Sequence, residues 1–73
     1  MDSYEKLANA IILQAVKDYR DALKKLARGR KNTSADDTKR ECERFFRSQW
    51  YSALTSVDGE MLIRKLNEEV INL

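Results

Sequence analysis

The chain has 73 residues, a formal net charge of +2 and a single cysteine, Cys42, with no histidine and no proline. One cysteine cannot form an internal disulfide, and without histidine it cannot build a structural zinc site, so two common supports of small domains are excluded. Because histidine and a glycine-rich phosphate loop are both missing, we predict a binding protein rather than an enzyme, with no catalytic residue, metal or cofactor.

Apolar residues recur at alternating spacings of four and three in the first third of the chain, which predicts a helix over residues 3–28. Leu13 falls among the polar residues of the opposite face and is therefore a candidate interaction residue. Gly29 is placed to end the helix in the left-handed conformation. The predicted seam consists of Ala8, Ile12, Ala15, Tyr19, Ala22 and Leu26, and is widened by Leu7, Ile11, Val16 and Leu23.

A second helix is expected over residues 35–54, with Ser34 as its cap. Its predicted core face consists of Cys42, Phe46, Trp50, Ala53 and Leu54. Phe45 lies at the edge of this face and Tyr51 lies well outside it. Aromatic and arginine side chains are enriched at binding hot spots, so Phe45, Tyr51 and the neighbouring Arg44 and Arg47 are candidate interaction residues.

A shorter third helix is expected over residues 58–72, after the break marked by Gly59. Met61 points away from its apolar face and is a further candidate interaction residue. Two long helices joined by a short loop favour an antiparallel hairpin. We therefore predict one all-α domain over residues 1–73, in which the third helix folds back over the hairpin or packs on another subunit.

Basic residues gather where the first two helices should meet. They compensate the dipole at a helix end, or they form an anion site for nucleic acid, a nucleotide or an acidic protein face. Members of this predicted basic patch are Lys24, Lys25, Arg28, Arg30, Lys31, Lys39 and Arg40.

The sequence also indicates where the protein resides. No apolar run reaches the roughly 18 residues that span a bilayer, and no secretory signal is recognisable. A lone thiol fits a reducing compartment, so we expect a cytoplasmic protein without a membrane partner, with Cys42 buried and inert.

Two segments of the chain carry a resemblance to known proteins: residues 10–20 and residues 41–66. The features of the second segment are Phe45-Phe46, Ser48, Trp50-Tyr51, Leu54-Thr55, Val57-Asp58-Gly59 and Leu62-Ile63. Both segments resemble a group of small helical proteins from phages, prophages and integrative elements of Gram-positive bacteria. The resemblance implies a mobile-element protein made in the cytoplasm of a bacterial host, where such proteins often bind and block a host component.

Three functions follow as hypotheses. The leading one is a counter-defence inhibitor that binds a host immune protein, such as a CRISPR nuclease. The second is a homo-oligomer that sequesters an anionic nucleotide signal, since a domain this short has a marginal core and gains from self-association. The third is a small regulator associated with nucleic acid, although a net charge of +2 is modest for that role.

Overall fold

The computed structural model describes residues 2–29 and 32–71. This part of the chain contains four helices and no strand: α1 (Asp2–Ala27), α2 (Thr33–Phe46), α3 (Gln49–Leu54) and α4 (Gly59–Ile71). The predicted all-α class is confirmed. The predicted count of three helices is wrong, because the segment expected to form one helix over residues 35–54 forms two. Among the described residues, no helix has the length and apolarity that crossing a bilayer requires.

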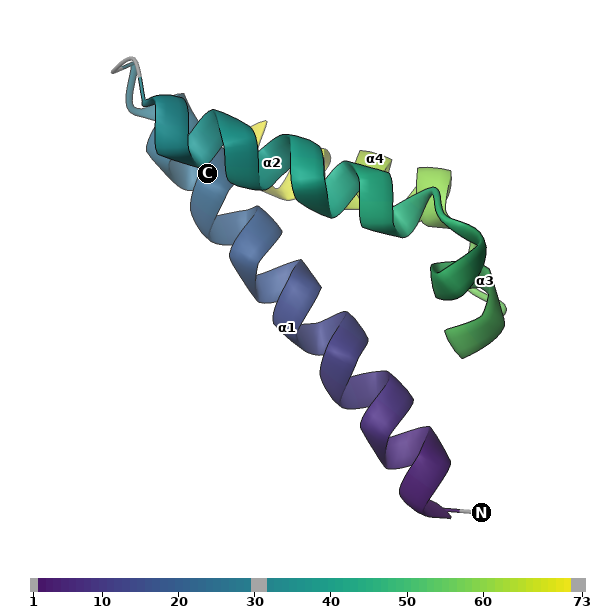
Figure 1. The fold of residues 1–73 in the computed structure, drawn as a ribbon. Coiled ribbons are helices and arrows are strands. Elements are labelled where there is room, and N and C mark those ends of the chain that lie inside the picture. The colour runs from purple at the N-terminus through teal and green to yellow at the C-terminus, as the bar shows by residue number, and fades with distance from the viewer. Residues whose placement is uncertain (1, 30–31, 72–73) are drawn as a thin grey trace.

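Helices α1 and α2 form the expected hairpin, which opens like a V from the loop that joins them (Figure 1). α4 runs back along α2 towards the loop, and α3 lies beyond the end of α2, facing the N-terminal half of α1. Gly29 has a φ of +79° and so takes the predicted left-handed conformation after α1. The cap of α2 is Asn32 rather than Ser34: its side-chain oxygen accepts a hydrogen bond of 2.9 Å from the N–H of Ala35.

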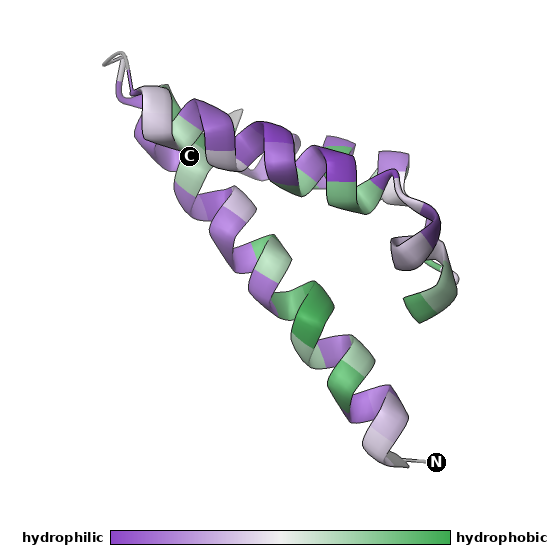
Figure 2. Cartoon of the chain, viewed as in Figure 1, coloured by the Kyte–Doolittle hydropathy of each residue, from purple (hydrophilic) through white to green (hydrophobic). Residues whose placement is uncertain are grey.

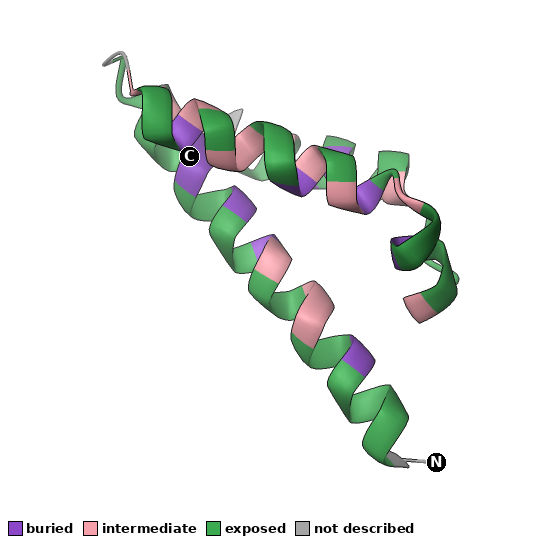
Figure 3. Ribbon diagram, viewed as in Figure 1, coloured by how far each residue is buried: buried purple, intermediate pink, exposed green. Residues whose placement is uncertain are grey.

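The core lies between α1, α2 and α4, and α3 adds Tyr51 to it. Figure 3 shows that buried positions on α1 are concentrated in its C-terminal half, whereas the N-terminal half is mostly exposed. The C-terminal half of the predicted α1 seam is therefore mostly buried, whereas its N-terminal half is not, and Leu7 is 59% exposed. The buried cluster consists of Val16, Tyr19, Leu23, Cys42, Phe46, Tyr51, Ile63 and Leu66.

A hydrogen-bonded network centred on Tyr19 ties three helices together. Its hydroxyl donates to Glu43 on α2 over 2.7 Å and accepts from the amide of Asn67 on α4 over 2.9 Å. Burial and the hydrogen bond to Glu43 raise the pKa of Tyr19 to about 12. Burial opposes ionisation of Glu43, but hydrogen bonds from Tyr19 and Lys39 outweigh it and lower the pKa of the Glu43 carboxyl.

The helix expected over residues 35–54 is interrupted by Ser48. Its hydroxyl donates to the carbonyl of Phe45 over 2.6 Å and accepts from the N–H of Tyr51 over 3.1 Å, so it ends one helix and caps the next. The interruption changes the helical phase. As a result Tyr51, expected outside the core, is 1% exposed, and Trp50, expected inside it, is 59% exposed.

The start of α4 is packed directly against the end of α2. A Cβ atom built on Gly59 would overlap the backbone carbonyl of Phe46, so only glycine allows this approach. The side chain of Asp58 caps α4 by accepting from the N–H of Glu60 over 3.0 Å. Arg47 forms an ion pair with Glu60 across the same junction. These contacts hold α3 between the ends of α2 and α4.

Candidate functional site

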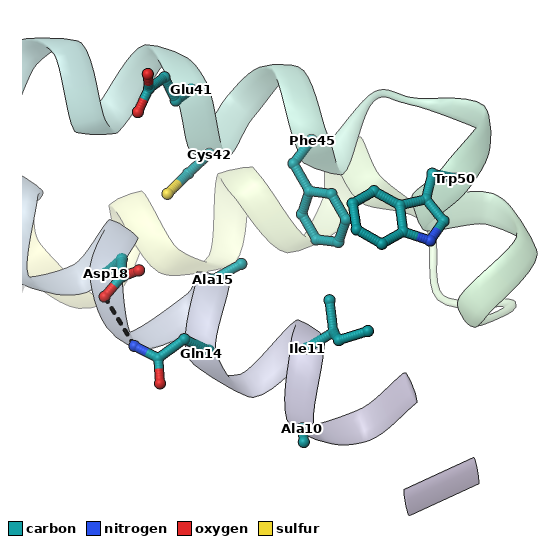
Figure 4. A pocket seen from close by; sticks show the side chains of 9 residues that line it. All are labelled: Ala10, Ile11, Gln14, Ala15, Asp18, Glu41, Cys42, Phe45 and Trp50. Carbon is teal, nitrogen blue, oxygen red and sulfur yellow. Dashed lines mark hydrogen bonds between the residues drawn. The ribbon is translucent and has the colours of Figure 1, made fainter. Parts of the chain in front are cut away.

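The open end of the V contains a groove of about 550 Å³ between α1, α2 and α3 (Figure 4). It arises because α1 and α2 diverge from a common loop, so that the space between them widens along α1 (Figure 1). The groove is lined by Ala10, Ile11, Gln14, Ala15, Asp18, Glu41, Cys42, Phe45 and Trp50.

Three large side chains make the wide end of the groove apolar. Ile11 rises from α1 towards Phe45 and Trp50 on the opposite wall (Figure 4). The rings of Phe45 and Trp50 meet edge to face, with centroids 5.4 Å apart. Figure 2 shows hydrophobic segments in the middle of α1 and at the end of α2, on either side of the opening. Trp50 is 59% exposed although it belongs to this apolar wall.

Two carboxylates mark the narrow end. Asp18 extends from α1 and accepts a 3.0 Å hydrogen bond from Gln14, while Glu41 stands on the rim of α2 (Figure 4). Between them lies Cys42, which is buried as predicted. Burial, reinforced by the negative charges of Asp18 and Glu41, raises the pKa of the Cys42 thiol to about 11. The thiol is therefore protonated at neutral pH and is a poor nucleophile.

The structure brings together only part of the predicted interaction set. Phe45 lines the groove, and Arg44 borders a smaller hollow beside it that Phe45 and Trp50 also line. Tyr51 was expected at an interface, and this is wrong because its side chain is buried in the core. Three further candidates lie apart from the groove lining: Arg47, which pairs with Glu60, and the exposed Leu13 and Met61.

Sequence reasoning missed Trp50 as a surface residue. A signal was present, since Ser48 followed by a polar residue and two aromatics is a plausible N-cap. Reading Ser48 as a cap would have shifted the helical phase and placed Trp50 outside the core. Ile11 and Asp18 gave no comparable signal, because their exposure depends on how far α1 diverges from α2.

The predicted basic patch contains carboxylates and internal ion pairs. Lys24, Lys25 and Arg28 are exposed, while Arg30 and Lys31 lie outside the described residues. Lys39 pairs with Glu43 over 2.9 Å, and Arg40 pairs with Asp36 over 3.1 Å. Lys25 faces a polar hollow next to the groove that also contains Asp18, Asp21 and Glu41. This part of the surface therefore carries both signs of charge.

Residues 2–29 and 32–71 contain no group of three or more acidic or cysteine side chains suited to hold a metal ion. The chain matches no family model, no curated protein and no solved structure. The groove has the geometry of an open and largely apolar surface.

Proposed function

We propose that the protein acts by binding another protein in the groove, and not by catalysing a reaction. The observation that carries the proposal is the exposed Trp50, which together with Phe45 faces Ile11 across the apolar end of the groove. Tryptophan buries a large area on binding and is the residue type most typical of interface hot spots. An exposed tryptophan that flanks a groove is poised to be covered by a partner.

The area of the surface supports the same proposal. The chain exposes 5579 Å². A compact monomer of this mass would expose roughly 4,700 Å². The difference is about 900 Å², close to the roughly 800 Å² that each partner buries in a standard interface. The open V contributes to this surplus, because it leaves half of α1 without intramolecular cover.

The resemblance to proteins of phages and mobile elements suggests the class of partner. We propose a host protein, bound and blocked by a counter-defence inhibitor made in the bacterial cytoplasm; a bacterial immune protein such as a CRISPR nuclease fits this role. Sequestration of a nucleotide and association with nucleic acid are less well supported. Both need a cationic surface, whereas the groove carries Asp18 and Glu41 and the basic patch is interspersed with carboxylates.

Site-specific photo-cross-linking in host cells tests the proposal. The photoreactive amino acid p-benzoylphenylalanine is placed at Trp50, on the groove, and separately at Leu13, which is similarly exposed at 66% but lies outside the groove lining. We expect a discrete protein adduct from position 50 that is absent from position 13. Equal labelling from both positions, or none from position 50, would show that the groove does not bind a protein.

A further inference from the structure

The two ends of the groove differ in chemistry, and their separation can be obtained from helix geometry. On α1, Ile11 and Asp18 are seven residues apart, which is two turns and about 10 Å along the axis. On α2, Phe45 and Glu41 are one turn apart and follow the same order from the open end to the closed end. The groove therefore runs from an apolar region at its wide end to a negatively charged region at its narrow end, midway along α1 and α2.

The negative charge at the narrow end is available to a ligand. Among residues 2–29 and 32–71, neither Asp18 nor Glu41 forms an ion pair. Asp21 extends the acidic surface into the adjoining hollow, where Lys25 supplies the opposite charge. Arg44 lines a further hollow together with Glu41, and three carboxylates against two cations still leave this end net negative. A cationic side chain placed there would gain attraction, whereas an anionic one would be repelled.

The walls of the groove also limit the backbone of its occupant. They are formed by α1, α2 and α3, whose backbone N–H and C=O groups form hydrogen bonds within the helices. The groove therefore has no strand edge with which an extended peptide could pair. An elongated groove between diverging helices instead suits an additional helix, which packs its apolar stripe between them as in a four-helix bundle.

We propose that the occupant is an amphipathic helix of the partner protein, with a large apolar side chain against Ile11, Phe45 and Trp50 and a lysine or arginine about two turns away, beside Asp18 and Glu41. This inference rests on the proposed function, since it describes the part of the partner that enters the groove. A groove filled by a second copy of the chain, or by an acidic helix, would contradict this inference.

Two designed helical peptides serve as probes. Both peptides carry leucine anchors. Two helical turns beyond the anchors, the first peptide has two arginines and the second has two glutamines. Each peptide is made with the anchors at the N-terminal end and, separately, at the C-terminal end. Trp50 is the only tryptophan of the chain, so its fluorescence reports binding at the groove directly. We expect the arginine peptide, in one of these two arrangements, to bind about tenfold more tightly than its glutamine counterpart, as two exposed ion pairs would give.

Paired variants assign this preference to the groove. Asp18→Asn with Glu41→Gln should remove the tenfold difference. Glu5→Gln with Asp37→Asn removes the same number of exposed carboxylates away from the groove lining and should preserve it. If both pairs behave alike, the attraction comes from the overall charge of the protein and the inference is wrong.

The remaining outcomes separate the inference from the proposed function. If position 50 cross-links to a protein but the two peptides bind equally, or neither binds, a protein enters the groove without the proposed charge pattern, so only the inference fails. If position 50 yields no protein adduct, both fail. Sedimentation that shows a dimer, converted to monomer by Trp50→Ser, would identify a second copy as the occupant and overturn the inference.

Discussion

Truncating the adjacent aromatics Trp50 and Tyr51 should have opposite consequences for stability and binding. Tyr51 is 1% exposed, with ring centroids 5.6 Å from Phe45 and 5.7 Å from Phe46. Replacing so buried an aromatic ring by alanine costs about 3–5 kcal/mol. Trp50 is 59% exposed and loses mainly its edge contact with Phe45, so Trp50→Ala should cost at most about 1 kcal/mol.

The difference is large on the scale of the whole domain, because a chain of this length has a free energy of unfolding of about 4–11 kcal/mol. Urea unfolding followed by circular dichroism measures both variants, whereas fluorescence cannot be used once the only tryptophan is removed. Trp50→Ala should retain nearly the wild-type midpoint yet lose binding at the groove. A larger loss of stability in Trp50→Ala than in Tyr51→Ala would refute the interruption at Ser48 and favour one continuous helix over residues 35–54.

Three other substitutions test the packing that supports the groove. Tyr19→Phe should lower the free energy of unfolding by about 1–2 kcal/mol at neutral pH. The pKa of Tyr19 is raised to about 12 in the folded protein, from about 10 in the unfolded chain. The stability that the Tyr19 hydroxyl contributes is therefore fully present below pH 10 and is lost as the pH rises towards 12. The urea midpoints of wild type and Tyr19→Phe should converge over this range. Tyr51→Phe should raise the melting temperature, since the buried hydroxyl of Tyr51 has no hydrogen-bond partner among residues 2–29 and 32–71. Gly59→Ala should cost about 1–3 kcal/mol in urea unfolding, despite the better helix propensity of alanine, because the added methyl group overlaps the carbonyl of Phe46.

The accuracy of the sequence predictions follows from how local each feature is. The span of α1 and the left-handed Gly29 depend on local periodicity and backbone sterics, and both were predicted. The orientation of Trp50 depends on helical phase. Each residue advances a helix by about 100°, so an interruption at Ser48 is enough to exchange the buried and exposed sides. Periodicity applied across the interruption therefore assigned Trp50 and Tyr51 to the wrong environments.

The groove could not be predicted from periodicity because it depends on the divergence of two helices. The apolar seam of α1 continues through Leu7 and Ile11 without a change in composition, so the sequence indicates that both are covered. In the structure the cover ends midway along α1, since α2 diverges and α3 is too short to replace it. The apolar pattern indicates that these residues favour burial, but it does not indicate whether this chain or another protein buries them.

The incomplete cover of α1 would link folding to the proposed binding of a partner. Between Tyr4 and Gln14 only Ala8 is buried, so the first half of α1 contributes little to the core. A partner that covers this segment favours the folded state over the unfolded one, and at one hundred times its dissociation constant adds about 2.7 kcal/mol to the free energy of unfolding. That gain is a substantial fraction of the about 4–11 kcal/mol expected for the free domain. The apolar residues in the first half of α1 add little to the core of the isolated chain because they are exposed. A partner that buried them would stabilise the fold through these same residues.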